Sequence, residues 1–457
     1  MRRNTQGKER WRQAPWLRRA ALVAAFAGAW PAWSLDLLQA YQAALEQDAT
    51  VRAARATADS ARERLPQARA QLLPNVAFSA GRNHNNLDLW QKSALGTLTP
   101  FEDRYYSFNQ TLQLRQPLFR KPLWDSVTQA SYLVQDADAT LERELQNLGV
   151  RVAGAYLEAL LAQDQLDLVL RQRAFISTQL DAARKALNAG SGTRTDIDEA
   201  QAKLDMNRAD ELEARQNLDF TRRQIEVLAG RPVDALALLD PARLALNPPE
   251  PTGLDAWLAL AEAGSPEIQA LKARREAARL EVAKASGAHY PTLDAVAQLT
   301  RSASENVTMT SSRYINRAVG VQFNLPLYAG GYVESTVRQA AAELTKADEL
   351  LEATRLDLGV RLHREFRGVT EGVLKVRAYE QAVASAEQLV RSSRRSFQAG
   401  SRTTLDVLNA EQQRQTALRD LAQARYLYMI SRVRLQALAG GDKQAPLAEL
   451  NGWLSGD

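Results

Sequence analysis

Hydrophobic and polar positions along the chain follow two different periods, and the change between them occurs twice. Over 35–73 and again over 254–290, apolar residues recur at helical spacing until a proline ends the pattern. After each proline the apolar residues alternate with polar ones, which predicts strands at about 75–82 and 292–301. The same order of helix and strand therefore appears in both halves of the chain.

A second pair of strands, at about 105–116 and 315–325, shows the alternation more clearly. Val319, Val321 and Phe323 occupy one face of the later strand, whereas the positions between them are small or polar. Such a pattern is typical of a strand between lipid and water. It also fits a hairpin of a soluble protein with one buried face. The mostly polar segment between the two strands of each half is not predicted to be a strand.

Two helical stretches of unusual length follow, at about 122–188 and 332–398, with no proline in their interior. At about 1.5 Å per residue, each helix could be on the order of 100 Å long. In the first stretch, apolar residues from Leu141 to Val169 step by three and four, which is a heptad seam. Returning helices are predicted at about 195–229 and 404–439.

Each long helix joins its returning helix through an Ala-Gly-Ser turn, and Gly190 and Gly400 lie 210 residues apart. A Thr-x-x-Asp capping pattern follows each turn and restarts the helix. The chain therefore reads as two copies of one unit. The predicted parts are a signal peptide at 1–34, a first repeat at 35–230 with its tip turn at about 189–195, a Pro-rich linker at 231–253, a second repeat at 254–440 with its tip turn at about 399–404, and a C-terminal tail at 441–457.

Composition narrows the possible functions. The 457 residues include no cysteine and only three histidines, so disulfides and thiolate metal sites are excluded, and no metal-ligand spacing is evident. An apolar run behind Arg18 and Arg19, followed by Ala-Trp-Ser at 32–34, predicts the cleavable signal peptide. Because this segment holds seven basic residues and one acidic residue, its removal changes the formal net charge from +5 to −1. The basic composition therefore indicates no nucleic-acid partner.

Four strands per chain cannot close a barrel, and their outer edges need partners. Self-association is the simplest solution. Three chains would supply twelve strands, an even number within the range of outer-membrane barrels. The helices would then continue away from the membrane as a tube.

The duplicated order of elements, Leu-Leu-Pro at 72–74, Gln-Pro-Leu-Phe at 116–119, Leu-Pro-Leu-Tyr at 325–328 and the two Ala-Gly-Ser turns together resemble the TolC family of trimeric outer-membrane channel-tunnels. The resemblance implies a mainly α fold with a membrane β-barrel portion. In a homotrimer, four strands per chain would complete a 12-stranded barrel, continued by a periplasmic α-helical barrel. It also implies an exit duct of a tripartite export system, whose other partners are a periplasmic adaptor (membrane fusion) protein and an inner-membrane ABC or proton-driven transporter. Proteins or small toxic compounds would be the cargo, and no cofactor or metal is implied.

The resemblance further suggests that the tip opens by uncoiling of inner helices. Arg402 is similar to the family arginine that ties the inner coil to a neighbour's Thr-Asp pair, here Thr195 and Asp196. Phe397 stands where the family has a tyrosine that hydrogen-bonds to the aspartate. Because phenylalanine lacks a hydroxyl, that second link is in question.

Asp406 matches a first ring of aspartates around the aperture, and Asn409 stands where a second ring would be. The loss of that second carboxylate predicts weaker block by multivalent cations. Ala189, Gly190, Ala399 and Gly400 match the turns that contact the adaptor. Threonine and aspartate at these positions also serve as ordinary helix caps, and one carboxylate can do both.

Other classes of protein remain open from the residues alone. A periplasmic adaptor would also have a long helical hairpin, but it would flank one hairpin with compact β domains. A structural coiled-coil protein of a secretion machine is a further alternative. An enzyme is not expected, since no nucleophile elbow or phosphate-binding loop is present.

Overall fold

The structure is a computed structural model that describes residues 35–92, 96, 98–307 and 310–455, so the predicted signal peptide at 1–34 lies outside the described residues. The elements, in chain order, are α1 (Leu37–Gln47), α2 (Ala49–Arg62), α3 (Arg64–Ala70), β1 (Asn75–Lys92), β2 (Leu98–Phe119), α4 (Lys121–Asn188), α5 (Arg194–Ala229), α6 (Leu254–Gly264), α7 (Pro266–Ser286), a 3-10 turn (Gly287–His289), β3 (Thr292–Val307), β4 (Thr310–Asn324), α8 (Tyr332–Gln398), α9 (Thr404–Leu438) and α10 (Ala445–Gly452).

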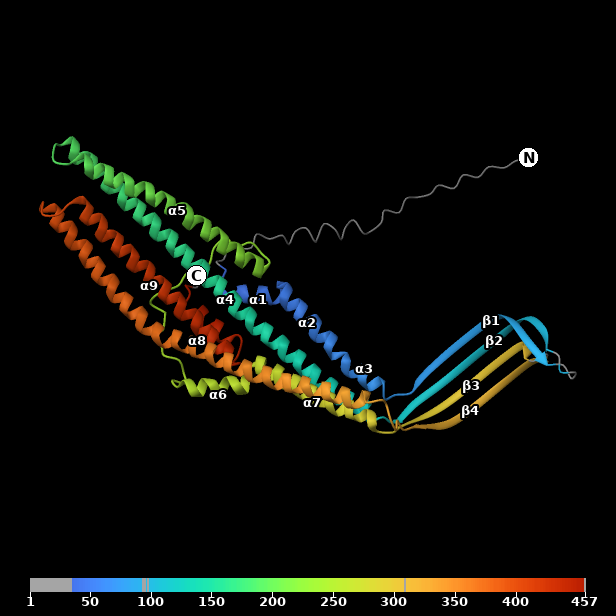
Figure 1. Cartoon of the computed structure of the whole chain (residues 1–457). Helices are drawn as coiled ribbons and strands as arrows, with labels where there is room; N and C mark the ends of the chain where they lie inside the picture. The colour runs from blue at the N-terminus through green and yellow to red at the C-terminus, as the bar shows by residue number, and fades with distance from the viewer. Residues whose placement is uncertain (1–34, 93–95, 97, 308–309, 456–457) are drawn as a thin grey trace, which may run out of the picture.

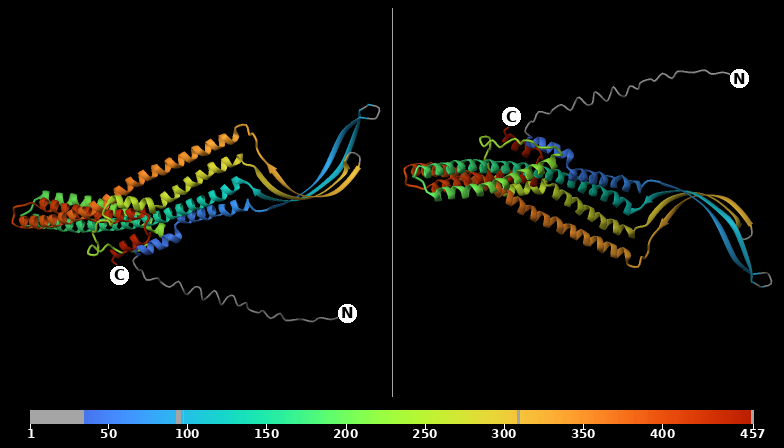
Figure 2. Two further views of the ribbon diagram at one scale, coloured as in Figure 1. Left: turned by 90° about the horizontal axis from the view of Figure 1, so that it is seen from below. Right: turned by 90° about the horizontal axis from the view of Figure 1, so that it is seen from above.

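The molecule is elongated, with the four strands at one end and the two helical hairpins at the other (Figures 1 and 2). The hairpins are α4 with α5 and α8 with α9, and their turns lie side by side at the far end. α4 also packs against α2, α7 and α9, while α8 packs against α7. The duplication read from the sequence is thus also an arrangement in space, in which each hairpin repeats the other.

The sequence pattern predicted a continuous helical segment at 35–73 and another at 254–290, but the structure divides both of them. The first divides into α1, α2 and α3, and the second divides into α6 and α7. Asp48 ends α1 in an extended conformation, and its carboxylate accepts a hydrogen bond from the backbone N–H of Val51 at 2.9 Å. Ser265 separates α6 from α7 because Pro266 follows it and disfavours helical geometry in the preceding residue.

The main hydrophobic core lies in the middle of the molecule, where α1, α4, α9 and α10 meet. Tyr156, Tyr428 and Leu447 are among its fully buried side chains. The Tyr156 hydroxyl lies 2.8 Å from the carbonyl oxygen of Leu35 and 3.0 Å from that of Ala237. Burial raises the pKa of Tyr156, so this hydroxyl remains a donor at every physiological pH.

The Pro-rich linker and the C-terminal tail join this core rather than extending into solvent. Leu35 pairs with Leu236 in a parallel bridge, and Leu239 pairs with Leu454 in an antiparallel bridge. The backbone N–H of Ser455 donates to the carbonyl of Leu238 at 2.7 Å. The linker and the C-terminal tail are therefore held beside each other.

The strands form one antiparallel sheet in the order β1-β2-β3-β4. They are longer than the sequence predicts: β2 has 22 residues and even β4 has 15. The mostly polar segments, which were not predicted to be strands, continue the hairpins, and Asn86 for example pairs with Arg104. Polar side chains on both faces hide the period of two, so only the partner strand reveals these extensions.

One buried carboxylate fixes the corner between the sheet and the helices. Asp294 at the start of β3 is 3 % exposed at its side chain, and it accepts hydrogen bonds from Arg115 Nε at 3.0 Å and from Arg120 Nε at 2.8 Å. Arg115 belongs to β2, and Arg120 stands between β2 and α4. The two arginines compensate the buried charge and hold the end of β2 against β3.

Candidate functional site at the hairpin tips

The two tips are built alike, down to individual hydrogen bonds. In the first, the Thr193 hydroxyl accepts from the backbone N–H of Asp196 at 3.2 Å, and the Thr193 N–H donates to Asp196 Oδ2 at 3.1 Å. In the second, Thr403 and Asp406 make the same two bonds at 3.3 Å and 2.9 Å. Each pair is a capping box that starts the returning helix. The Thr-x-x-Asp pattern in the sequence predicted both.

Gly190 and Gly400 turn the chain with φ values of 72° and 75°, in the left-handed region that favours glycine. A Cβ added at either position would meet nothing within 4 Å. The glycines are therefore required by the backbone conformation and not by crowding within the chain. Ala189 and Ala399 beside them are exposed, so the tips present small residues and open surface.

Arg402 makes its hydrogen bond within the α8–α9 hairpin. Its guanidinium Nη1 donates to the hydroxyl of Ser393 at 3.1 Å, and Ser393 is fully buried. No bond joins Arg402 to Thr195 or Asp196 within the described part of one chain, and the predicted link to a neighbour's pair stays a prediction. Asp196 has room for it, because the N–H and the hydroxyl of Thr193 both donate to Oδ2 and no described residue donates to Oδ1. Thr195 is exposed on the first turn of α5.

Phe397 lies near the end of α8 and is 41 % exposed. As the sequence indicates, it has no hydroxyl with which to reach Asp196. Its backbone carbonyl instead accepts the N–H of Gly400 at 2.9 Å and helps to close the turn.

Asp406 and Asn409 differ in their surroundings. The N–H and hydroxyl of Thr403 hold the pKa of Asp406 below its ordinary value, and the charge of Arg402 adds to the effect. Asp406 is therefore a carboxylate at neutral pH. Asn409 Oδ1 accepts a hydrogen bond from Lys203 Nζ at 2.7 Å. Burial lowers the pKa of Lys203, because it removes water from the charged ammonium group.

The Lys203–Asn409 hydrogen bond joins the two hairpins, and the sequence did not reveal it. Two further contacts do the same. Leu408 of α9 is 3 % exposed and is buried in a small hydrophobic cluster with Ile176 of α4 and Leu204 of α5. The guanidinium of Arg394 on α8 lies 5.0 Å from the ring centroid of Phe175 on α4. We call these three contacts the inter-hairpin lock.

Each hairpin also contains a buried glutamate on its returning helix. Glu211 of α5 accepts from Arg173 of α4 at 2.7 Å and pairs with Arg215 at 2.6 Å. Glu411 of α9 pairs with Arg414, and Arg394 of α8 lies 3.8 Å from it. These pairs hold each hairpin closed on itself. The sequence offers only the i, i+3 or i, i+4 arginine as a signal, since 211 and 411 are not equivalent positions of the repeat.

Chemistry of other kinds is not evident at these tips. Within the ranges that the structure describes, no group of three or more His, Asp or Glu side chains is arranged to hold a metal ion. None of the helices described is long and apolar enough to cross a membrane.

Two long hairpins that meet near their tips, joined to an open four-stranded sheet with one exposed apolar face, are the architecture of a class of outer-membrane channel proteins. The family model described as "Outer membrane efflux protein" matches residues 40–231 and 257–441, and the chain belongs to this family. The resemblance inferred from the duplicated elements is thereby confirmed. Since the family comprises outer-membrane channels, the adaptor and scaffold alternatives do not hold.

Individual relatives agree with this assignment. The chain is 33% identical to the proteases secretion protein PrtF of Dickeya chrysanthemi over 427 residues, which cover 92% of each chain. It is 34% identical to the alkaline protease secretion protein AprF of Pseudomonas aeruginosa over 419 residues, covering 91% of this chain and 86% of AprF. Among solved structures, the outer membrane protein VceC of Vibrio cholerae superposes with a TM-score of 0.76 at 20% identity, covering 89% of this chain and 96% of VceC.

Proposed function

We propose that three copies of this chain form the outer-membrane exit duct of a tripartite export system. The observation that carries the proposal is the open sheet. Within the described strands, β1 and β4 each have an edge without a partner strand. Apolar side chains on these strands are exposed, with Phe78 at 65 % and Val319 at 88 %. Unpaired edges and an exposed apolar face are unstable in water, and both are satisfied when identical sheets join into a 12-stranded barrel in lipid.

The strand lengths support a barrel that reaches beyond the membrane. A tilted strand needs about 9–11 residues to cross the hydrocarbon core. All four strands exceed this length, the shortest having 15 residues. The excess is mostly polar and lies at the β1–β2 and β3–β4 ends, away from the helices (Figure 1). Those ends would project from the outer surface of the membrane.

The helices would form the periplasmic tube. α4 has 68 residues and α8 has 67, so each spans on the order of 100 Å. With α5, α9 and the shorter helices α2 and α7 packed beside them, three chains would surround a continuous passage. The signal peptide predicted at 1–34 would direct the chain to the periplasm, from which it would enter the outer membrane.

The tip would be the gate. The α8–α9 hairpin can move inward or outward relative to α4–α5 only if the inter-hairpin lock opens, which means withdrawing Leu408 and separating Lys203 from Asn409. Arg402 would add a link to the neighbour's Thr195 and Asp196. Asp406 would form a negative ring at the aperture. Opening would therefore break many weak contacts together, as in a two-state transition.

The exposed turns would receive the adaptor protein. Ala189, Gly190, Ala399 and Gly400 form the far end of the molecule, and small side chains let another backbone approach closely. An inner-membrane ABC or proton-driven transporter would provide the energy.

The cargo we propose is a polypeptide. The support is the similarity to PrtF and AprF, which are named for the secretion of proteases. To test this, the chain would be produced in a Pseudomonas aeruginosa strain that lacks AprF, and extracellular alkaline protease would be measured. Restored secretion supports a polypeptide cargo. A trimer correctly placed in the outer membrane that restores none contradicts it.

The duct itself is tested apart from its cargo. Detergent extracts of the outer membrane would be examined by native mass spectrometry, and the purified protein would be inserted into planar bilayers. A homotrimer that conducts ions supports the duct. A monomer in the soluble periplasmic fraction would refute it.

A further inference from the structure

The two repeats differ at one junction, and the difference points to a binding site. In each repeat the returning helix ends beside a break between two shorter helices: α5 ends beside the last residue of α1, just before α2, and α9 ends beside the last residue of α6, just before α7. Gly230 follows α5, and a Cβ added there would stand 2.9 Å from Gln47 Cγ. Gly440 follows α9, and a Cβ there would clash with the carbonyl of Gly264. Both junctions are therefore tightly abutted.

The first junction contains its own anion. The Asp48 carboxylate caps α2 by accepting the N–H of Val51 at 2.9 Å. Arg151 of α4 lies 3.3 Å from the same carboxylate. The positive end of the helix and the guanidinium thus share one negative charge.

The second junction keeps the arginine and lacks that carboxylate. Arg361 lies 210 residues after Arg151, at the equivalent position of the repeat. The residue before α7 is Ser265, whose side chain makes no capping hydrogen bond. Glu267 does not replace the cap, because it lies within the first turn of α7 and its carboxylate accepts from Arg361 Nη2 at 2.7 Å and not from a backbone N–H at the helix start. Glu267 places a negative charge in the first turn of α7, but no described side chain accepts a hydrogen bond from the backbone N–H groups at the start of the helix.

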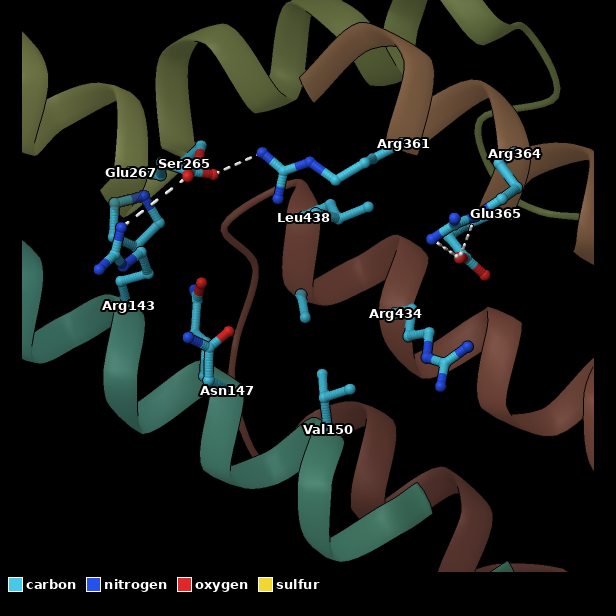
Figure 3. Close-up of a pocket in the computed structure, with 13 residues that line it drawn as sticks. Arg143, Asn147, Val150, Ser265, Glu267, Arg361, Arg364, Glu365, Arg434 and Leu438 are labelled. Carbon is cyan, nitrogen blue, oxygen red and sulfur yellow. Dashed lines mark hydrogen bonds and ion pairs between the residues drawn. The ribbon is translucent and has the colours of Figure 1, made fainter. Parts of the chain in front are cut away.

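A cavity of about 240 Å³ opens at this position, between α4, α7, α8 and α9 (Figure 3). Its charged lining consists of Arg143, Arg361, Arg364, Arg434, Glu267 and Glu365. Four arginines against two glutamates leave an excess of positive charge. Glu267 and Glu365 are already paired, with Arg361 and Arg364 respectively. Arg434 has no ion-pair partner within the described chain.

Two buried polar side chains also line the cavity without a hydrogen-bond partner among the described residues. Gln146 of α4 is 8 % exposed, and Ser265 is 3 % exposed. Buried polar groups are almost always paired. The Gln146 amide, the Ser265 hydroxyl, the Arg434 guanidinium and the N-terminus of α7 are therefore hydrogen-bond donors that lack an acceptor among the described residues.

We propose that this cavity binds a small tetrahedral oxyanion of the phosphate class. The anion accepts from the N-terminus of α7, Ser265 Oγ, Gln146 Nε2 and the Arg434 guanidinium. It replaces the carboxylate that Asp48 supplies in the first repeat, and so ties the junction between α9 and the α6–α7 break to α4. The cavity is complete within one chain, and the proposal does not depend on the duct function.

The anion is free in solution and not the headgroup of a membrane lipid. α7 has 21 residues, so about 30 Å of helix separates the cavity from β3 and from the membrane. A headgroup would have to leave the bilayer surface to reach it.

The test is calorimetric titration of the purified full-length protein with inorganic phosphate, at constant ionic strength against chloride. Saturable binding of one phosphate per chain is expected. Ser265→Asp supplies the carboxylate found in the first repeat, and it should abolish the binding heat while the protein still folds. Arg434→Gln should weaken binding about tenfold or more, as expected for loss of a charged hydrogen bond.

Arg367→Gln is the matched control, since it removes an arginine of α8 that pairs with Glu371 and does not line the cavity. Its affinity for phosphate should equal that of the wild type. Absence of saturable binding, or equal binding by the wild type, Ser265→Asp and Arg434→Gln, overturns the proposal. A short-chain phosphatidic acid that binds while inorganic phosphate does not would overturn the assignment to a free anion.

Discussion

Replacement of Lys203 by methionine should loosen the tip of the channel. Methionine keeps the length and apolar stem of the side chain but removes the ammonium group that donates to Asn409 Oδ1 at 2.7 Å. Hydrogen bonds from charged groups contribute about 1.5–3 kcal/mol, and the partial exposure of this pair reduces the value to about 1 kcal/mol. A coupling of about 1 kcal/mol corresponds to about a fivefold change in an equilibrium constant.

A trimer contains three Lys203–Asn409 hydrogen bonds, one in each chain, and the replacement removes all three. If the three links open together, about 3 kcal/mol is removed, and the open fraction of the tip should rise by about 150-fold. Single-channel recording in planar bilayers measures this as a greater probability of the high-conductance state. Leu408 and the Arg394–Phe175 contact remain in place, so the protein should still fold and form trimers.

Arg208→Met is the matched control for Lys203→Met. Arg208 is exposed on the same helix, and its ion pair is with Asp205, also on α5. Its replacement should leave the open probability unchanged. If Lys203→Met gates like the wild type and like this control, the link between the hairpins does not hold the tip closed.

Three further changes probe other parts of the structure. Asn409→Asp should convert the bond with Lys203 into an ion pair and add a second carboxylate near Asp406. The recorded channel should open less often, and lower concentrations of multivalent cations should block it. Unchanged block would contradict the aperture ring. Leu408→Ala should cost about 2–5 kcal/mol of tip packing because Leu408 is 3 % exposed, and its larger open probability would show that the hydrophobic cluster contributes to closure. The cap bonds lower the pKa of Asp406 from 3.8, so the stability that the cap provides is fully present above pH 3.8 and is lost as the pH falls through the lowered pKa. Channel opening should therefore increase only in strong acid. An increase that begins near pH 6 would exclude Asp406 as the cause.

The elements that depend on local pattern could be predicted from the sequence. The long helices, for which 122–188 and 332–398 were predicted, occupy Lys121–Asn188 and Tyr332–Gln398. The capping boxes at Thr193 and Thr403 follow from four residues each, since a cap is a local interaction. The breaks at Asp48 and Ser265 carry cap signals too, but the helical period on both sides concealed them.

Features that depend on distant pairing could not be predicted. Lys203 and Asn409 are 206 residues apart and occupy non-equivalent positions of the repeat, so no spacing relates them. The contact depends on how the two hairpins pack against each other. The extended strands depend in the same way on partner strands, because a polar run has no period of its own. The gate residues of the family resemblance remain predictions, since they concern contacts between chains.

Disulfide cross-linking of β1 to β4 tests most directly whether identical neighbours complete the sheet. The chain has no cysteine of its own, so pairs can be introduced cleanly, with one cysteine at Phe78 or Ala80 and the other at Val319 or Val321. Two strands lie between β1 and β4, which places these positions about 14 Å apart within one chain, beyond the reach of a disulfide. Oxidation in outer membranes should therefore give linked dimers and closed trimers for at least one pair. If every pair remains monomeric although the protein is folded and in the membrane, the strands are not completed by neighbouring copies.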